Sequence, residues 1–333
     1  MTETSFTFVL PTLNAAGPLF ERALGSIREQ AYPPDHVEIV VADGGSTDDT
    51  RDVAKRYRAH VIENPNRLAE WGVKEGFAVA KGDIVVVFAA DNELVGSHWL
   101  EHVARLFASH PTLSAVFGRL VSGPDDPPLN KYIELIQSEP LNWFLNRNLD
   151  WYLERHPPQE DGFSVFEIDP SRPLVWGANG LAVRRDHALQ AWTRRGYVAD
   201  VDAFHAMVRA GHRLVAYTQA PYCYHHQVAT LWDLRRKWLR NARQHLVQQA
   251  SERELDWVLV PGFRRRAVLW GVYSLVPIVS AADALRYVYR DRTIYWLYHP
   301  LATLLQAATY VQALAASKGG RNVLRRALVR RHR

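Results

Sequence analysis

The first 120 residues alternate short runs of β-branched residues with segments of helical period, and this alternation limits the fold more than any other feature. We read four runs as strands, at residues 6–10, 37–42, 59–63 and 83–89, and the segments beside them as helices, at residues 18–30, 48–58, 67–80 and 97–109. Apolar strands separated by helices predict a largely parallel sheet with helices on both faces. We therefore expect an α/β, Rossmann-like fold.

The rest of the chain is less regular. Ser46 and Asp49 have the spacing of a capping box, which predicts that they begin the second helix. Residues 120–175 are rich in Pro, Asn and Trp and have no clear period, so we expect a loop-rich insertion there. A helix at 200–212, a strand at 213–218 and a basic amphipathic stretch at 230–246 are expected to follow.

Composition narrows the class of protein. With 333 residues, of which 47% are hydrophobic, the chain can form a large core. Its single cysteine, Cys223, excludes an internal disulfide framework and fits a reducing compartment. Residues 1–14 have neither the basic region nor the apolar region of a signal peptide, so we expect the catalytic part to face the cytoplasm.

Two apolar stretches and a basic tail close the chain. Residues 267–282 and 294–317 contain no charged residue, but the first is short and includes Pro277, and the second holds His299, Pro300 and two Gln. Basic residues flank both stretches, so the positive-inside rule predicts no clear two-span topology. We expect interfacial or re-entrant helices at headgroup depth, the alternative being a helical pair packed on the catalytic domain.

The tail itself, residues 318–333, holds seven Lys or Arg and no acid, which predicts an anionic partner. Because it follows the apolar stretches and has no aromatic residues for base stacking, an anionic membrane surface is favoured and nucleic acid is not.

Polar residues follow three of the expected strands, at 11–14, 43–48 and 90–93. In an open parallel sheet, ligands bind beyond the carboxyl ends of the strands, so chemistry is expected at these positions. Gly44 and Gly45 allow a ligand to approach the backbone, and Asp43 offers acceptors to a ribose or a uracil edge. A loop entering a capped helix is the alternative for this segment. No GxGxxG fingerprint is present, which argues against a dinucleotide.

Six segments occur in the order found in one enzyme family: VLPTLNAAGPLFERALGSIREQ, VEIVVADGGSTDDT, KGDIVVVFAADNEL, WGANGLAVRRDHAL, DVDAFHAMVRAGHRL and YHH. Across residues 5–246 the chain resembles the family 2 glycosyltransferases of the GT-A fold. The resemblance implies a nucleotide-sugar donor, and a divalent metal ion held by a D-x-D motif at the end of a central strand. It implies a donor site formed by Pro11, Thr12, Asn14, Asp43, Gly44, Arg67, Lys74, Ala90 and Asp91. For Arg67 and Lys74, a solvated helix face is the alternative to the donor phosphates.

The expected metal motif departs from the family pattern, because Ala89-Ala90-Asp91 lacks the first acid. One carboxylate can still hold Mg²⁺ or Mn²⁺ when substrate phosphates and water supply the other ligands. We expect Glu93 and His225 to complete the site with Asp91, and choose His225 over His226.

The resemblance also implies an acceptor side. Asp200 matches the general base of the family, although Ala199 replaces the usual Glu before it. Attack by one acceptor hydroxyl would invert the anomeric centre. Asp200 could instead be a helix N-terminal acid, and Trp176 could belong to the core. The expected acceptor-side residues are Trp176, Gly177, Asn179 and Asp202.

The segment LRRKWLRN, residues 234–241, only loosely resembles the Q-x-x-R-W motif of processive synthases, so processive synthesis is not supported. Its Arg236, Lys237 and Arg240 could neutralise the leaving diphosphate, or form a basic helix face on anionic lipid.

These observations predict a GT-A domain over residues 1–225, with a donor half (1–120) and an acceptor half (121–225), a basic helical segment (226–262), and an apolar helical pair with a basic tail (263–333). The predicted activity is metal-dependent, inverting transfer from a nucleotide-sugar to a hydroxyl of a lipid-linked or cell-envelope glycan, at the cytoplasmic face of the membrane. Transfer to polyprenyl phosphate and an inactive, glycan-binding or scaffold domain are the alternatives. Spacing alone predicts neither the sugar nor the acceptor.

Overall fold

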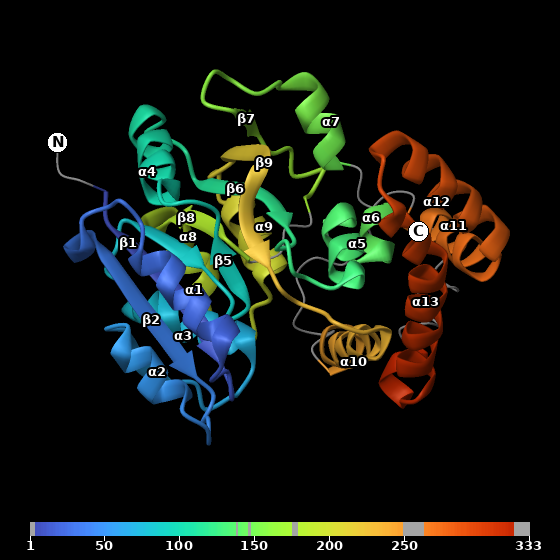
Figure 1. Cartoon of the computed structure of the whole chain (residues 1–333), viewed down its shortest axis with the longest axis horizontal. Coiled ribbons are helices and arrows are strands. Elements are labelled where there is room, and N and C mark those ends of the chain that lie inside the picture. The colour runs from blue at the N-terminus through green and yellow to red at the C-terminus, as the bar shows by residue number, and fades with distance from the viewer. Residues whose placement is uncertain (1–3, 138, 146–147, 175–178, 249–262, 323–333) are drawn as a thin grey trace. The chain divides into compact units, whose positions relative to one another are not determined.

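The computed structural model describes residues 4–137, 139–145, 148–174, 179–248 and 263–322 (Figure 1). These residues form two compact units, one of residues 1–123 and 148–226, the other of residues 124–147 and 227–333. Trp176 and Gly177 lie outside the described residues.

A mixed nine-stranded sheet forms the centre of the first unit, in the order β3-β2-β1-β4-β8-β6-β9-β5, with β7 also paired to β9. The pairs β1–β2, β2–β3 and β1–β4 are parallel, as predicted, whereas β8 is antiparallel to both β4 and β6. The strands are β1 (Phe6–Thr12), β2 (Val37–Asp43), β3 (His60–Glu63), β4 (Ile84–Val87), β5 (Asn92–Leu94), β6 (Ala115–Val121), β7 (Phe163–Glu167), β8 (Leu181–Arg184) and β9 (Leu214–His225).

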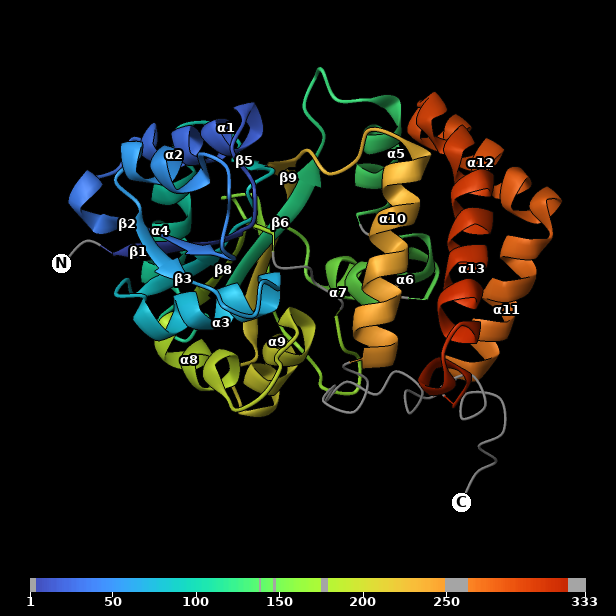
Figure 2. The ribbon, with the colours of Figure 1, turned by 90° about the horizontal axis from the view of Figure 1, so that it is seen from below.

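Helices cover both faces of this sheet (Figure 2). Because side chains alternate along a strand, Phe8 of β1 joins a core with α1, α2 and α4, and Val9 joins a second core with α3, α8 and α9. Both faces are buried at the centre of the sheet, which explains why β1, β2 and β4 are mostly apolar. The helices of this unit are α1 (Pro18–Arg28), η1 (Pro34–His36), α2 (Thr50–Arg56), α3 (Ala69–Val79), α4 (Trp99–Ser109), α7 (Asn148–Arg155), α8 (Arg185–Thr193) and α9 (Asp200–Arg209).

Helix α3 lies directly against the sheet because two glycines, one turn apart, face β1. A Cβ on Gly72 would lie 2.8 Å from Cβ of Pro11, and a Cβ on Gly76 would lie 2.2 Å from Cγ1 of Val9. The backbone of α3 therefore approaches the β1 side chains more closely than any side-chain-bearing residue would permit.

The second unit is helical. Its elements are α5 (Pro128–Ile136), α6 (Pro140–Leu145), α10 (Leu231–Asn241), the π-helical turn η2 (Ala242–Gln248), α11 (Phe263–Leu275), α12 (Pro277–Asp291), the 3₁₀ helix η4 (Ile294–Tyr298) and α13 (His299–Ala315). Tyr132 of α5 packs against Trp296 of η4, and Trp238 of α10 belongs to the same buried cluster. This core groups residues 124–147 with the C-terminal helices, whereas we expected them in the acceptor half; the boundary after residue 226 lies one residue from the predicted boundary at 225.

Two local predictions were wrong. Residues 120–175 are not loop-rich: they contain α5, α6, α7 and β7. Ser46 does not cap α2, because its hydroxyl bonds Asp43, and α2 begins after Asp49 without a side-chain cap. A capping box instead begins α10, where Thr230 accepts from the Asp233 amide and Asp233 accepts from the Thr230 amide.

No single helix among the described residues is both long and apolar enough to cross a bilayer. Residues 268–275 and 277–291 meet that criterion of length and composition only as a pair, with a bend of 86° between them.

A buried histidine occupies the core of the second unit. Nδ1 of His299 lies 2.9 Å from the hydroxyl of Tyr132, and Nε2 lies 2.8 Å from the hydroxyl of Tyr273. The rings of Trp143 and Trp296 also contact it. Burial lowers the pKa of His299 to about 4, so the imidazole is neutral at pH 7.

We expect His299→Gln to make the free energy of unfolding less dependent on pH between pH 7 and pH 4. A depressed folded-state pKa contributes stability above the unfolded pKa of about 6.5, and this contribution is lost as the pH falls toward 4. The difference between the wild-type and variant unfolding free energies should therefore shrink by roughly 3 kcal/mol between pH 7 and pH 4. Urea unfolding followed by tryptophan fluorescence measures it. His60→Gln, at an exposed position on β3, should leave the curve unchanged, and parallel curves for the wild type and His299→Gln would contradict the prediction.

Candidate active site

Four parallel strands end at one edge of the sheet. Thr12, Asp43 and Glu63 are aligned across β1, β2 and β3, and β4 runs in the same direction beside β1. The predicted donor-binding residues from different parts of the chain therefore lie at or just beyond a common edge.

Hydrogen bonds join the loops after β1 and β2. The Gly44 amide donates to the carbonyl of Thr12 at 2.8 Å, and the Asn14 amide donates to Oγ of Ser46 at 2.8 Å. Asn14 is left-handed, with φ 51°, and its side-chain oxygen accepts from the Thr47 amide at 2.8 Å. Asn is among the few residues that tolerate this conformation, so its role in the structure is to hold the two loops together.

Asp43 is fully buried at the end of β2. Its carboxylate accepts from the hydroxyl and amide of Ser46, from the Gly45 amide, and from Nε of Arg51 at 2.6 Å. Burial opposes ionisation, but the hydrogen bonds from Ser46 and Arg51 outweigh it and lower the pKa of Asp43. Asp43 is thus an ionised organiser of the loop, and its predicted contact with a donor stays a prediction.

The loop after β3 lies very close to this edge of the sheet. A Cβ on Gly44 would lie 3.2 Å from the carbonyl oxygen of Thr12 and 3.4 Å from Cα of Arg67, so only glycine fits without displacement. Arg67 is left-handed, with φ 60°, and its side chain is exposed. The structure therefore brings Thr12, Gly44 and Arg67 together, as the predicted donor site requires.

The predicted metal carboxylate lies in a tight turn after β4. The Asn92 amide donates to the carbonyl of Ala89 at 3.1 Å, and the His226 amide donates to the carbonyl of Asp91 at 2.9 Å. These bonds hold the Asp91 backbone, while its carboxylate makes no hydrogen bond or ion pair with any described residue. Asn92 is fully buried, and neither its Oδ1 nor its Nδ2 has a hydrogen-bond partner in the described part of the chain.

Strand pairing separates the three predicted metal ligands. Asn92 pairs with His225 and Glu93 with Tyr224 across β5 and β9, so Glu93 and His225 point to opposite faces. His225 instead lies 3.2 Å from Nδ2 of Asn179, and Glu93 lies 3.4 Å from Nε2 of His226. Within the described ranges, no three His, Cys, Asp or Glu side chains form a group that could hold a metal. His226, and not the predicted His225, is the histidine beside Glu93.

The predicted acceptor side is organised by α9. Asp200 and Asp202 lie in its first turn, with Asp202 fully buried, and neither caps the helix through its side chain. Nε2 of His205 lies 2.9 Å from the carbonyl of Leu174, which fixes the residue before the segment that holds Trp176 and Gly177. Asn179 precedes β8, whose pairing with β4 places it at the same edge as Asp91: the Gly180 amide donates to the carbonyl of Val87 at 2.9 Å.

Comparison with known proteins agrees with this geometry. The profile of the family described as "Glycosyl transferase family 2" matches residues 7–163, which hold β1 to β4 and the Asp91 turn. Residues 7–163 belong to glycosyl transferase family 2.

Three curated relatives are similar to part of this chain. The O-antigen chain rhamnosyltransferase WbaN of Salmonella anatum is 30% identical over 128 residues, 38% of this chain and 40% of that protein. A PGL/p-HBAD biosynthesis glycosyltransferase of Mycobacterium bovis (strain BCG / Pasteur 1173P2) is 31% identical over 127 residues, 36% and 48% of the two chains. Validoxylamine A glucosyltransferase of Streptomyces hygroscopicus subsp. limoneus is 26% identical over 178 residues, 50% and 38%. The chain thus spans less than half the length of these curated relatives.

Among solved structures, the mannosyltransferase PcManGT of Pyrobaculum calidifontis, in complex with GDP-Man and Mn²⁺, superposes with a TM-score of 0.55 at 18% identity. The match covers 95% of this chain and 88% of that one. The fold of the glycosyltransferase domain is GT-A.

Lys74 of the glycosyltransferase domain has a structural contact that the sequence did not predict. Its ammonium group donates to the carbonyls of Arg194 and Gly196, at 2.7 and 2.9 Å, and lies 4.6 Å from the ring centre of Trp71. The two carbonyls belong to the loop between α8 and α9, just before Asp200. Lys74 therefore ties α3 to the loop that leads to the predicted base, and its predicted contact with donor phosphates stays a prediction.

The predicted diphosphate-binding residues belong to the second unit. Arg236 bonds Asp233, Lys237 bonds Gln227, and Arg240 is an exposed residue near the end of α10. Their role toward a donor diphosphate, or toward lipid, stays a prediction.

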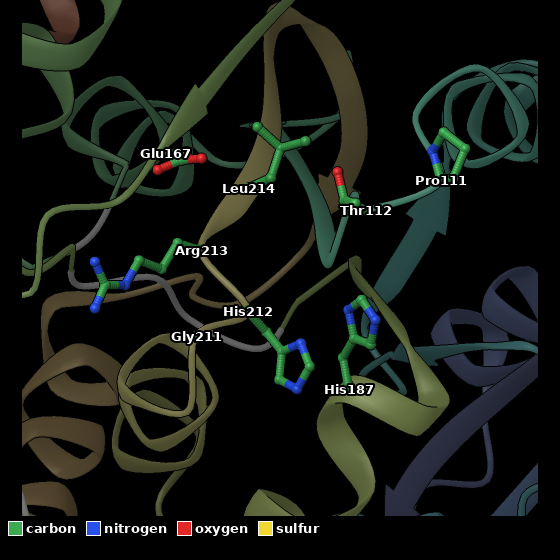
Figure 3. A pocket seen from close by; sticks show the side chains of 8 residues that line it. All are labelled: Pro111, Thr112, Glu167, His187, Gly211, His212, Arg213 and Leu214. Carbon is green, nitrogen blue, oxygen red and sulfur yellow. The ribbon is translucent and has the colours of Figure 1, made fainter.

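A hollow of about 530 Å³ opens at the other edge of the sheet, where β6 and β9 begin (Figure 3). The rings of His187 and His212 stack there with centroids 4.0 Å apart, and Ser114 lies 3.0 Å from Nδ1 of His187. Burial, and then the charge of His212, lower the pKa of His187. This hollow holds none of the residues predicted for the glycosyltransferase site.

Sequence reasoning missed Arg51, and it preferred His225 to His226. Arg51 could have been found from its place one residue into α2, where a long side chain can reach back to the end of β2. Choosing between His225 and His226 required the register of β5 and β9, which spacing does not reveal.

We expect Lys74→Met to destabilise the protein by about 2 kcal/mol, because two carbonyls lose a charged hydrogen-bond donor. Urea unfolding would measure the loss, and limited proteolysis would detect increased cleavage in residues 194–199. Lys55→Met is the matched control, since Lys55 makes only an exposed ion pair with Asp52 at 3.2 Å, worth less than about 1 kcal/mol. Equal effects of the two substitutions would contradict the assignment of Lys74.

Proposed function

We propose that this chain is a metal-dependent glycosyltransferase that moves a sugar from a nucleotide-sugar to a hydroxyl of a lipid-linked or cell-envelope glycan, with inversion. The observation that carries the proposal is the carboxylate of Asp91, which has no hydrogen-bond or ion-pair partner among the described residues, at the edge of a GT-A sheet where the loops of Thr12, Gly44 and Arg67 converge.

The donor side supports a nucleotide. The Gly44 backbone is as close to Thr12 as glycine permits, and the Asp43 network holds the loop after β2 in one conformation before any ligand binds. A preorganised loop loses little conformational entropy on binding. Exposed Arg67, whose Cα lies beside Gly44, adds positive charge that attracts a diphosphate.

The residues at the Asp91 turn fit a hard divalent cation. Asp91 offers a carboxylate not used in internal bonds, and the buried Asn92 amide has no partner of its own among the described residues. Mg²⁺ and Mn²⁺ commonly take one or two protein carboxylates and complete their shell with substrate phosphates and water, which suits a site without an acid at Ala89. Bound there, the ion would neutralise charge developing on the leaving diphosphate.

We assign the general base to Asp200, at the N-terminus of α9. An acceptor hydroxyl becomes a good nucleophile only when its proton is accepted during attack, and a single displacement inverts the anomeric centre. Lys74 would act as a positioning residue, since it holds the loop before Asp200.

The acceptor class is inferred from two relatives, which are named for O-antigen chains and for PGL/p-HBAD biosynthesis. Polyprenyl phosphate is a second candidate acceptor, favoured by the basic C-terminal residues. Because this acceptor is already an anion, it needs no base.

We expect nucleoside diphosphates to stabilise the protein only with Mn²⁺ or Mg²⁺, and Asp91→Ala to remove that dependence. Ligand that binds only the native state at 100 times its Kd contributes about 2.7 kcal/mol. A thermal-shift panel of UDP, GDP and dTDP with and without metal measures this, with Asp35→Ala, an exposed acid in η1, as the control. Unchanged metal dependence in Asp91→Ala would remove Asp91 from the site, and the absence of binding by any nucleotide would refute the proposed function.

We expect Asp200→Asn to reduce kcat by about 10²-fold or more with a hydroxyl acceptor, because general base catalysis is lost. Asp186→Asn, an exposed acid in the first turn of α8, should retain full activity. Release of the nucleoside diphosphate in single-turnover assays measures the rate. Activity that survives Asp200→Asn with polyprenyl phosphate, but not with a hydroxyl acceptor, would identify the second candidate acceptor, and unimpaired transfer to a hydroxyl would exclude Asp200 as the base.

A further inference from the structure

The C-terminal helices expose apolar side chains in regular stripes. On α11 the stripe is Val268, Val272 and Leu275, on α12 it is Ile278, Leu285 and Tyr289, and across η4 and α13 it is Ile294, Leu297 and Leu301. Each stripe has a helical spacing of three, four or seven residues. We call these nine residues the apolar face.

This exposure is concentrated in one part of the chain. Of the seventeen large hydrophobic residues that are exposed among the described residues, thirteen lie between Val268 and Val311. Ile278 is 81% exposed and Tyr289 is 89% exposed. Scattered exposed apolar residues are ordinary, whereas a contiguous patch on a folded protein marks an interaction surface.

The opposite sides of the same helices are already packed. On α12, Ser280, Ala284 and Tyr287 are buried, and the ring of Tyr287 stacks on Trp296 with centroids 4.5 Å apart. The core of this unit therefore uses the other side of α12 and leaves Ile278, Leu285 and Tyr289 without cover.

Charge identifies the chemistry of the partner. Among the described residues 263–322, eight are Lys or Arg and two are acids, whereas residues 1–262 contain 27 Lys or Arg and 33 acids. Arg286 and Arg292 are exposed on and just after α12, close in sequence to Tyr289. A surface that is apolar and strongly basic complements an anionic lipid bilayer, which offers acyl chains and phosphates at adjoining depths.

We propose that the apolar face docks onto an anionic lipid surface, with its aliphatic side chains at the boundary between headgroups and acyl chains. Tyr289 then lies at headgroup depth, where an aromatic body and a polar hydroxyl are both accommodated. Arg286 and Arg292 meet lipid phosphates. The proposal depends on neither the donor nor the acceptor of the proposed function.

Co-sedimentation of the full chain with vesicles tests it. The wild type is expected to bind vesicles of phosphatidylcholine with 30 mol% phosphatidylglycerol, and to bind pure phosphatidylcholine vesicles at least tenfold more weakly. Raising NaCl from 0.05 to 0.5 M should weaken binding to the anionic vesicles, because salt screens the electrostatic attraction. No binding to either vesicle would overturn the proposal.

Variants separate the two contributions. Ile278→Glu with Leu285→Glu should reduce binding to anionic vesicles at least tenfold, and Arg286→Gln with Arg292→Gln by roughly 25-fold, at about fivefold for each lost charge. Val79→Glu, at an exposed position on α3, should bind as the wild type does. Circular dichroism checks folding, and Ile278→Ser with Leu285→Ser provides a milder pair if the glutamates unfold the protein.

A second copy of the chain is the competing occupant of the apolar face. Light scattering without lipid would show a stable dimer that Ile278→Glu with Leu285→Glu dissociates, and that result would overturn docking on lipid. Because vesicle binding is measured without nucleotide, metal or acceptor, its outcome is independent of whether the chain transfers sugar.

Discussion

The in-register parallel pairing of β1 with β2 and β4 is the constraint on which the rest of the first unit depends. It aligns Thr12 with Asp43, and it sets the end of β4, from which the chain turns through Asp91, beside the same edge. Parallel strands need crossover connections, and the helices that supply them bury both faces of the sheet. Polar side chains therefore gather where the strands end, because the interior is apolar on both sides.

At that edge, many of the polar side chains form hydrogen bonds within the protein. Asp43 and Asn14 form their hydrogen bonds mainly with the loops that carry them. Lys74 forms its two hydrogen bonds with the loop before Asp200. Asp91 differs, since its backbone is held at both ends of the turn while its carboxylate makes no hydrogen bond or ion pair with the described residues. An ordered scaffold around one available acid is the arrangement expected of a binding site that forms before its ligand arrives.

The sequence predicted the parallel strands β1, β2 and β4 well because they are mostly apolar on both faces, and it predicted the edge because polar residues begin where the strands stop. It failed where long-range contacts decide. Ser46 and Thr230 both have cap-like spacing, yet the Ser46 hydroxyl accepts from the distant Asn14 amide and donates to Asp43, while Thr230 begins α10. Within residues 124–147, α5 does carry a helical period, since its buried Leu129, Tyr132, Ile133 and Ile136 are spaced three, four and seven residues apart, but the helices on which they pack lie far away in the sequence. The positions of Glu93 and His225 on opposite faces follow from a strand register that no local pattern encodes.

The two glycines of α3 determine how substitutions in this helix would affect the loop before Asp200. Lys74 lies midway between Gly72 and Gly76, whose missing side chains let the helix rest on Pro11 and Val9. A methyl group at Gly76 would overlap Val9, so even alanine would push the helix away from the sheet and carry the Lys74 ammonium group away from Arg194 and Gly196. Gly72 and Gly76, which have no functional group, thus determine whether the Lys74 ammonium group can reach its two carbonyl partners. Substitutions at either glycine would act on the loop before Asp200 from the far side of α3, without altering a single polar atom.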